Sequence, residues 1–304
     1  MIVFMKILAV VVTHNRCALL ERCINHLFVQ KRIPSEILVI NNSSTDGTLA
    51  MLEQRRVTVI TQENLGSAGG WHRGIQYAID GNFDAVWLMD DDGYPDTEAL
   101  ELLERQLSSE VVCASSVVVC EDNPNRFVFP FPLLDSSGMP KLFAYPRKIA
   151  VLDKLQSISP ESMYPFAHFF NGALISVPAA RRAGNVNCDF FMFGDEVDYF
   201  FRLRQTGRVV SVLNAFHFHP DVTERPYTPA KVYYFVKNTL ILNHRYMNRV
   251  WLRDILAVFV VLVRTARRNG LLSAIEYIAG KNRMLLTQAI SRGLQGQIAK
   301  DFSG

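Results

Sequence analysis

The chain of 304 residues lacks long apolar runs and low-complexity tracts, and it has only five cysteines. The cysteines show no zinc-site spacing, and an odd number of them argues against a framework of disulfides. The longest apolar run covers nine residues, whereas about 20 are needed to cross a bilayer. The apolar start runs into a strand-like stretch without a cleavage site, so we expect no signal peptide. These absences predict a cytoplasmic location with reduced thiols.

The formal net charge is only +3, and we expect no nucleic-acid partner. However, the charge is unevenly distributed. From Leu240 onward there are ten Lys and Arg against three Asp and Glu, so the preceding 239 residues carry a net charge of about −4. This division predicts an anionic surface or partner for the C-terminal segment.

The first hundred residues alternate short β-branched runs with helical patterns. Residues 17–30 have the apolar spacing of an amphipathic helix, and the other linking segments are long enough for helices. The order β-α-β-α-β-α-β predicts an α/β fold, with a mostly parallel central sheet flanked by helices. The expected strands cover residues 6–13, 36–41, 57–61, 84–90, 169–176 and 208–220.

Two later regions differ from this alternation. Residues 121–165 are rich in Pro, Phe and Ser with weak periodicity, so we expect a long, irregular excursion of the functional kind. From Ala230 the pattern is helical nearly to the end. We therefore expect a catalytic domain over residues 1–239 and a helical, basic segment over residues 240–304.

Polar clusters follow three of the expected strands. These are Thr13-His14-Asn15, Asn41-Asn42 and Asp90-Asp91-Asp92. In open α/β sheets, ligands bind beyond the carboxyl ends of the strands. The three clusters are therefore expected to point into one crevice.

Asp90 and Asp92 are candidates for a metal site. Neighbouring carboxylates repel one another, so the fold itself does not require this cluster. Mg²⁺ or Mn²⁺ is commonly held by one or two carboxylates together with substrate phosphates. No Lys or Arg stands beside the aspartates in the sequence to replace such a cation. A solvated turn is the alternative.

The stretch "NLGSAGGWHRG" supplies Gly66, Gly69, Gly70 and Gly74. Glycines allow a backbone to approach a phosphate closely, and the start of a following helix favours anions. Arg73 could clamp a diphosphate with two hydrogen bonds. The alternative is a flexible turn, because the stretch matches neither the P-loop nor the dinucleotide fingerprint.

Two further motifs carry titratable groups. "FGDEVDYFFR" places Asp195, Glu196 and Asp198 at an expected helix start, where acids either stabilise the helix dipole or include a general base. "HFHP" places His217 and His219 on one face of a strand. A histidine there is either structural or a ligand.

Together these motifs resemble the family 2 glycosyltransferases over roughly residues 6–240. The order is VVTHNR, INNSSTDGT, NLGSAGGWHRG, WLMDDDG, NGALIS, FGDEVDYFFR and a downstream His. AGGWHRG followed by DDD is most similar to bacterial galactofuranosyltransferase-like and rhamnosyltransferase-like members, which build cell-surface polysaccharide such as O-antigen. The resemblance implies the nucleotide-diphospho-sugar transferase (GT-A) fold and an inverting reaction.

The resemblance also implies roles for individual residues. Asp90, Asp92 and His219 would hold Mn²⁺ or Mg²⁺. Glu196 would be the general base, with Asp195 as the alternative, because many relatives have Glu-Asp where this chain has Asp-Glu. Many relatives also have Asp where this chain has Asn41 or Asn42, which leaves the nucleotide open. The donor would be contacted by Thr13, Asn15, Asn41, Asn42, Asn64, Gly66, Arg73, Asp91, Asn171 and Gly172.

The expected partners follow from the resemblance and from the basic C-terminal segment. The donor would be UDP-galactofuranose, with dTDP-rhamnose as the alternative, and the acceptor a cell-surface or lipid-linked glycan. Residues 255–263, flanked by arginines within 249–268, predict peripheral contact with the inner face of the membrane. A core helix or a homo-oligomer contact is the alternative for this run. A nucleotidyltransferase and a non-catalytic glycan-binding protein are the other functions to be weighed.

Overall fold

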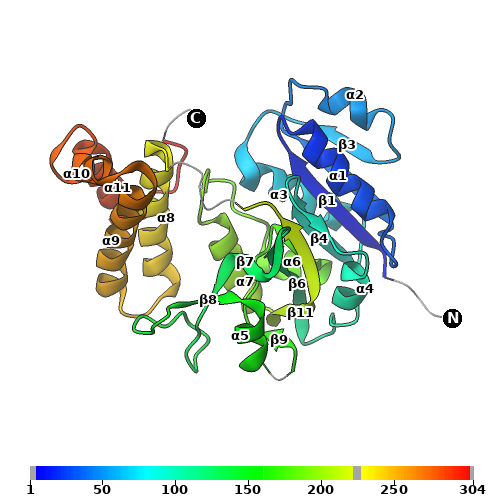
Figure 1. The fold of residues 1–304 in the computed structure, drawn as a ribbon. Helices are drawn as coiled ribbons and strands as arrows, with labels where there is room; N and C mark the ends of the chain where they lie inside the picture. Colours follow the sequence, from blue (N-terminus) through cyan, green and yellow to red (C-terminus); the bar gives the residue numbers. More distant parts are fainter. Residues whose placement is uncertain (1–4, 160, 222–226, 302–304) are drawn as a thin grey trace. The chain divides into compact units, whose positions relative to one another are not determined.

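Strand β1, Ile7–Thr13, is labelled in Figure 1. Every residue of this strand is buried. A strand that is apolar at every position is typical of a parallel sheet covered by helices on both faces. The structure is a computed structural model, and it describes residues 5–159, 161–221 and 227–301. Within these ranges it confirms the expected mixed α/β architecture.

The contacts within the chain divide it into two compact units. Unit 1 comprises the chain up to residue 186 together with residues 199–221, and unit 2 comprises residues 187–198 and 222–304. The expected boundary at 239/240 falls inside helix α8, Pro229–Tyr246. The segment 187–198, which carries the acidic motif, therefore belongs with the C-terminal helices.

Unit 1 is built on a mixed sheet with the main strand order β3-β2-β1-β4-β10-β6-β11-β5. Strand β1 pairs in parallel with β2 and β4, and β2 pairs in parallel with β3. Beyond this parallel half, β10 is antiparallel to β4 and β6, whereas β11 is parallel to β6. The strands are β2 (Glu36–Asn41), β3 (Thr58–Thr61), β4 (Ala85–Asp90), β5 (Tyr94–Pro95), β6 (Val111–Cys120), β10 (Asn171–Ser176) and β11 (Arg208–His219).

Helices cover this sheet through apolar faces. Helix α1, Cys17–Phe28, buries Leu20, Cys23, Ile24 and Leu27, which is the spacing of one helical face. These side chains join one core cluster with the residues at alternate positions of β1. The remaining helices of unit 1 are α2 (Thr48–Leu52), α3 (Gly66–Asp80), α4 (Ala99–Glu104), α5 (Leu152–Ser157) and α6 (Val177–Ala183).

The glycine-rich stretch is helical from Gly66, so the expectation that a helix only follows the stretch is wrong. Helix α3 begins at Gly66, so the later glycines of the motif lie inside it. A Cβ atom at Gly70 would lie 2.5 Å from Val12 Cγ1, and one at Gly74 would lie 2.4 Å from Val10 Cγ1. The glycines therefore allow α3 to pack closely on β1, which accounts for them without a phosphate.

The region 121–165 is also more regular than expected. Strand β7, Asn123–Pro132, pairs with β6 and with β8, Lys148–Val151. Helix α5 and the short strand β9, Met163–Tyr164, follow. Aromatic residues of β7 are buried against β6 in a separate apolar cluster. The expectation of an irregular excursion is wrong for β7, β8 and α5, because buried aromatic residues stabilise a strand even where prolines interrupt the pattern. Residues 133–147, between β7 and β8, contain no helix or strand.

Unit 2 is helical, as expected from Ala230 onward. It contains α8 and the first turn of α7 (Asp195–Arg204), together with α9 (Val250–Asn269), α10 (Leu271–Ala279) and α11 (Arg283–Leu294). Its core includes Tyr233, Leu240, Val261, Tyr277 and Ala289. In the described part of the chain, none of the helices has the length and apolar character required to cross a membrane.

Candidate active site

The register of the sheet brings the predicted polar clusters together in unit 1. Thr13 is opposite Asn41 in the pairing of β1 with β2, and Val12 is opposite Asp90 in the pairing of β1 with β4. The three strands thus end side by side, as the sequence predicts. We call Thr13, Arg16, Asp90, Asp91, Asp92 and His219 the strand-end site.

Arg16 lies beside the aspartates in the structure, although it is distant from them in the sequence. Its Nη1 lies 2.9 Å from Asp91 Oδ1 and 2.9 Å from Asp92 Oδ2. The Thr13 hydroxyl donates to Asp91 Oδ2 at 2.7 Å. Burial raises the pKa of Asp91, while the Thr13 hydrogen bond and the Arg16 charge act in the opposite direction. The expectation that no basic residue adjoins the cluster is wrong, because the loop before α1 folds back onto it.

His219 reaches the other oxygen of Asp92. Its Nε2 lies 3.0 Å from Asp92 Oδ1, and its Nδ1 lies 2.7 Å from the carbonyl oxygen of Pro220. A carbonyl only accepts hydrogen bonds, so Nδ1 carries the proton. In the neutral ring, Nε2 then turns a lone pair toward the carboxylate. Two electron-rich atoms at this separation require a shared proton or a metal ion.

The donor atoms of Asp92 and His219 fit a divalent cation. Two ligands at right angles on an ion with bonds of about 2.1 Å are about 3.0 Å apart. The hydrogen bond from Nδ1 to a backbone carbonyl is the usual support of a metal-binding histidine. Among the residues that the structure describes, however, no three His, Cys, Asp or Glu side chains already form a metal site. Asp90 ends β4 two residues before Asp92, and Arg16 provides the positive charge at the cluster.

His217 lies two residues before His219 and is buried. A Cβ atom at Gly93 would lie 2.3 Å from its Nε2, and one at Gly172 would lie 3.3 Å from its Nδ1. Burial, together with the neighbouring His219, lowers the pKa of His217 to about 3, so the ring is neutral. His217 therefore supports the backbone that follows the aspartates, while His219 meets Asp92.

The predicted nucleotide-contacting asparagines shape the loops around the strand-end site. Asn41 Oδ1 accepts from the Ser44 backbone at 3.0 Å, and Asn42 Nδ2 donates to the Gly66 carbonyl at 3.2 Å. Their side chains are buried. The exposed Asn15 and Asn64 side chains accept from backbone amides in the same way, that of Thr45 for Asn15 and that of Gly66 for Asn64.

The remaining predicted donor contacts lie on β10 and α3. Asn171 is opposite Met89 in the sheet, one residue before Asp90. Its buried Oδ1 has no hydrogen-bond partner among the described residues. Gly172 has a φ of 97°, a left-handed conformation that favours glycine. Arg73 is exposed on α3.

The acidic motif forms a turn in unit 2 that begins α7. We call residues 193–198 the acidic turn. Phe193 and Gly194 have φ values of 59° and 102°, both in the left-handed region. Asn238, buried on α8, donates to the carbonyl oxygens of Met192 at 2.9 Å and Phe193 at 2.7 Å. This side chain holds the strained backbone that leads into Asp195.

Asp195 has the electrostatic properties of a general base. It is buried, and its Oδ2 has no hydrogen-bond partner within the described part of the chain. Burial, together with the charges of Glu196 and Asp198, raises the pKa of Asp195 to about 7. A carboxylate with a pKa near neutrality is suited to accept a proton in catalysis. Glu196, the base expected from the sequence, is half-buried beside it.

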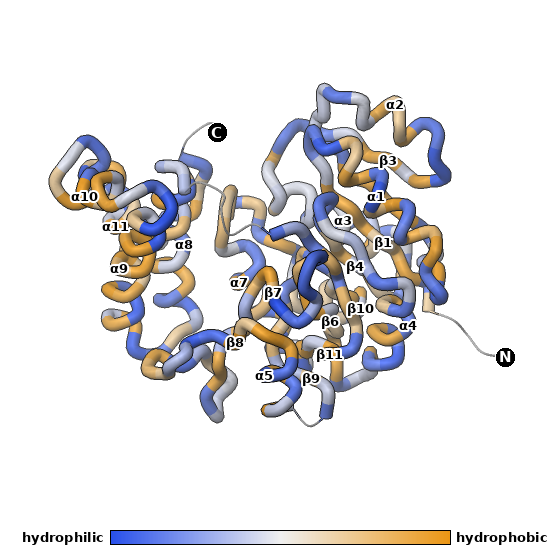
Figure 2. The backbone as a smooth tube through the Cα atoms, in the orientation of Figure 1, coloured by the Kyte–Doolittle hydropathy of each residue, from blue (hydrophilic) through white to orange (hydrophobic). Residues whose placement is uncertain are grey.

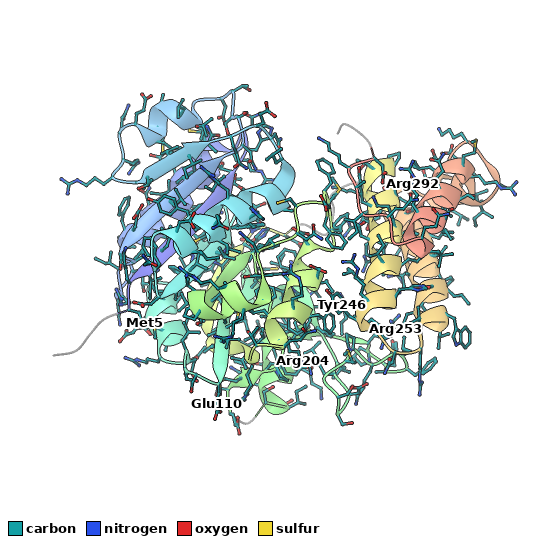
Figure 3. All side chains as sticks on the ribbon, turned by 180° about the vertical axis from the view of Figure 1, so that it is seen from behind. Met5, Glu110, Arg204, Tyr246, Arg253 and Arg292 are labelled. Atoms are coloured by element: carbon teal, nitrogen blue, oxygen red, sulfur yellow. The ribbon has the colours of Figure 1, made fainter. Side chains whose placement is uncertain are left out.

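Asp198 fixes the other side of the acidic turn. Its Oδ1 accepts from the hydroxyl of Tyr246 at 2.7 Å, and Arg245 Nη1 lies 3.4 Å away. Tyr246, labelled in Figure 3, ends α8 eight residues after Asn238. Sequence reasoning missed both α8 residues, because nothing near the motif indicates a partner that is 45 or more residues away.

The sheet of unit 1, with carboxylates gathered where its parallel strands end, defines the class of the chain. It has the GT-A fold of the nucleotide-diphospho-sugar transferases. Mannosyltransferase PcManGT from Pyrobaculum calidifontis, solved with GDP-Man and Mn²⁺, matches with a TM-score of 0.54 and 14% identity over 97% of this chain and 86% of that one. S. aureus TarS 1–349 matches with a TM-score of 0.57 and 13% identity over 96% and 81%.

Sequence comparisons give the family. The profile described as Glycosyl transferase family 2 matches residues 8–154. Galactofuranosyltransferase GlfT1 of Mycolicibacterium smegmatis is 30% identical over 223 residues, 71% of this chain and 71% of the relative. GlfT1 of Mycobacterium tuberculosis is 30% identical over 71% of this chain and 70% of the relative. The chain belongs to glycosyltransferase family 2 and is a glycosyltransferase.

Proposed function

We propose that the chain transfers galactofuranose from UDP-galactofuranose to a hydroxyl of a cell-surface polysaccharide or lipid-linked glycan. The observation that carries this proposal is the 30% identity to galactofuranosyltransferases over 71% of the chain. Transfer of rhamnose from dTDP-rhamnose is the second candidate. Family membership favours a transferase over a nucleotidyltransferase or a non-catalytic glycan-binding protein.

We propose that the reaction depends on Mn²⁺ or Mg²⁺ held by Asp90, Asp92 and His219. The donor set supports this, since Asp92 Oδ1 and His219 Nε2 are 3.0 Å apart and the histidine proton is on Nδ1. A bound divalent cation would neutralise charge on the leaving diphosphate. The Arg16 guanidinium, which contacts Asp91 and Asp92, limits repulsion within the cluster.

In the proposed reaction, a carboxylate of the acidic turn accepts the proton of the acceptor hydroxyl. The hydroxyl oxygen bonds to the anomeric carbon on the side opposite the diphosphate, whose own bond to that carbon breaks, so the configuration inverts. Glu196 is the base favoured by the motif. The burial and raised pKa of Asp195 support that neighbouring carboxylate instead. The proton acceptor is one of these two residues, and the dependence of turnover on pH distinguishes them.

The experiment that tests the proposal is a donor panel. Purified protein with Mn²⁺ and a soluble acceptor should release UDP from UDP-galactofuranose, and chelation of the metal should stop the release. Nuclear magnetic resonance of the product should show the opposite anomeric configuration to that of the donor. Release of pyrophosphate would indicate a nucleotidyltransferase. Turnover of UDP-glucose or UDP-N-acetylglucosamine, without turnover of the two proposed donors, would contradict the donor assignment.

We also propose that the acceptor is lipid-linked and that the protein acts at the inner face of the membrane, through residues 249–268. The basic composition of the C-terminal segment supports this location. Homo-oligomerisation through the same residues is the alternative.

A further inference from the structure

Helix α9 exposes an apolar stripe on the surface of unit 2. Trp251, Ile255 and Phe259 follow one another at intervals of four residues and are 71%, 60% and 61% exposed. Residues four apart lie on one helix face. We call these three residues the α9 stripe, and Figure 2 shows the apolar character of this helix.

The stripe lies on the side of α9 that does not face the core. Ala257, Val261 and Thr265 are the buried residues of the helix and point into unit 2. At 100° per residue, Ile255 is turned about 160° away from Ala257. The stripe therefore does not belong to the core of unit 2, whereas the opposite face of the same run contributes Ala257 and Val261 to that core.

Neighbouring helix α10 adds to the apolar surface. Val261 of α9 and Tyr277 of α10 belong to the same core cluster of unit 2. On α10 the outward side chains are again large and apolar, namely Leu271, Leu272, Ile275 and Ile278. Soluble monomers seldom expose so many large apolar residues on adjacent helices, so the surface is suited to a partner.

Arginines stand at both ends of the α9 stripe. Arg249 precedes the helix, and Arg267 lies in its last turn, about 80° around the helix axis from Phe259. Arg253, labelled in Figure 3, and Arg268 lie on the side of Ala257 and do not flank the stripe. Among the described residues of the segment after Leu240, the three acids have partners other than Arg249 and Arg267 within unit 2. Asp254 accepts from Asn243 and His244, Glu276 pairs with Lys281, and Asp301 pairs with Lys237 and Arg292.

The charge pattern decides between a lipid surface and a second copy of the chain. Because both ends of the stripe are basic, two copies packed stripe to stripe would bring arginine against arginine in either direction. An anionic membrane surface would instead attract both ends while the stripe enters the boundary between headgroups and acyl chains. Tryptophan, which begins the stripe, is enriched at that boundary.

We propose that the α9 stripe and its flanking arginines dock the protein on an anionic lipid bilayer, with α9 lying along the surface. The inference builds on the proposed transfer to a lipid-linked acceptor, because docking would place the enzyme where such an acceptor is found. The α10 side chains extend the docking surface. The helix enters the interface and does not span the bilayer.

Sedimentation of the full chain with vesicles tests the proposal. Vesicles of phosphatidylglycerol and phosphatidylethanolamine should bind the protein, and phosphatidylcholine vesicles should not. The double variant Ile255→Ser/Phe259→Ser should lower the partition coefficient at least ten-fold, because two buried apolar side chains are lost. Arg249→Gln/Arg267→Gln should lower it roughly thirty-fold at low salt and less at high salt.

Matched controls come from unit 1. Val29→Ser/Ile33→Ser removes two apolar side chains that are 60% and 57% exposed, and Arg56→Gln/Arg182→Gln removes two exposed arginines. Neither control should change vesicle binding. All variants should keep the wild-type circular dichroism spectrum and the turnover of a soluble acceptor. Turnover with a soluble acceptor also keeps the docking test separate from the test of the transferase.

Two results would overturn the proposal. The first is wild-type protein that does not distinguish anionic from neutral vesicles, or stripe variants that bind as well as wild type. The second is a wild-type dimer in light scattering that Ile255→Ser/Phe259→Ser converts to a monomer, with no vesicle binding by either protein. That outcome would assign the surface to a second copy of the chain.

Discussion

Arg16 Nη1 lies 2.9 Å from Asp92 Oδ2, so a guanidinium is already bound to one of the predicted metal ligands. A divalent cation at Asp92 must therefore compete with this ion pair or share the carboxylate with it. The buried carboxylates of Asp91 and Asp92 depend on the same guanidinium for their charge balance. Arg16 is thus expected to control both the stability of the metal-free protein and its affinity for the metal.

The variant Arg16→Gln should have a lower melting temperature than wild type in chelator, by several degrees, because two buried carboxylates lose their counter-charge. Addition of Mn²⁺ should raise the melting temperature of the variant more than that of wild type, since the competitor is gone. Thermal denaturation with and without Mn²⁺ measures both effects. Arg55→Gln, which removes a different ion pair, is the control. An equal response to Mn²⁺ in Arg16→Gln and wild type would show that Arg16 does not compete with the metal.

Asp92→Asn should abolish binding of Mn²⁺ and lower turnover by several orders of magnitude. The substitution keeps the shape of the side chain but removes the charge that faces Arg16 and His219. Calorimetric titration with Mn²⁺ reports the metal affinity independently of activity. Asp122→Asn, at an exposed carboxylate, should bind Mn²⁺ like wild type. Full turnover of the wild-type enzyme in chelator would contradict a role for the metal.

The pH dependence of turnover should identify the base. If Asp195 is the proton acceptor, kcat/KM of wild type rises with pH through about 7 as that carboxyl ionises. Asp195→Asn should then lose roughly 10²- to 10⁴-fold in turnover and lose this limb of the profile. Glu196→Gln should retain the limb. The opposite pattern in the two variants would assign the base to Glu196, as the motif suggests.

Asp195 should also make stability depend on pH. Because its pKa is raised on folding, the folded state binds its proton more tightly, and the stability due to that proton is lost as pH rises from about 4 to about 7. Asp195→Asn should therefore be more stable than wild type at pH 8 and similar to it near pH 4. Urea denaturation at the two pH values measures the difference. An equal effect of the substitution at both pH values would contradict the raised pKa.

Asn238 is expected to position the acidic turn. Asn238→Ala removes the two hydrogen bonds to residues 192 and 193, and the backbone before Asp195 should lose its strained conformation. We expect kcat to fall roughly 10- to 100-fold with an unchanged KM for the donor, because small displacements of catalytic groups are costly.

Asn243→Ala is the matched control for Asn238→Ala. Asn243 is another buried asparagine of α8, and its side chain donates to Asp254 instead of to the acidic turn. Both variants should lose stability, but only Asn238→Ala should lose kcat. Equal losses of kcat would reduce Asn238 to a structural role.

Gly70→Ala should destabilise unit 1 although alanine favours helices. The added methyl group would lie 2.5 Å from Val12 Cγ1, and overpacking of a core typically costs about 1–3 kcal/mol. This exceeds the gain in helix propensity of about 1 kcal/mol. Gly47→Ala is the control, because its nearest neighbour, Cys17 Sγ, would be 3.9 Å away. Denaturant titration measures both free energies of unfolding, and an unchanged value for Gly70→Ala would contradict the close packing of α3.

The parallel half of the fold could be predicted because β1 and β4 are apolar at every position before the last. Ile7–Thr13 and Ala85–Asp90 can be buried only between helices, and their polar ends then meet at one edge of the sheet. Strand β7 could not be predicted in the same way. Its Pro and Asn residues are unusual in strands, and the strand is stabilised by its pairing with β6. The glycines of α3 were misread because close packing on Val12 and close approach to a phosphate require the same residue.

The residues of the candidate site that lie at strand ends could be predicted from the sequence. The residues that reach the site through the packing of loops and helices could not. Asp92 and His219 come together because the sheet fixes both strands. Arg16 reaches the aspartates through the conformation of a loop, which no periodicity specifies. The same holds for Asn238 and Tyr246, whose contact with the acidic turn depends on how α8 packs in unit 2.

The path of the chain through the two units has a consequence for synthesis. The chain enters the helical unit at residue 187, returns to the sheet unit at residue 199 and leaves it again at residue 222. During synthesis, domains generally fold as units, and the N-terminal domain folds first. The acidic turn therefore leaves the ribosome roughly 45 residues before Asn238, which must be in place to hold Phe193. The strand-end site can form on the nascent chain, whereas the acidic turn, which carries the proposed proton acceptor, takes up its conformation only after α8 has been made.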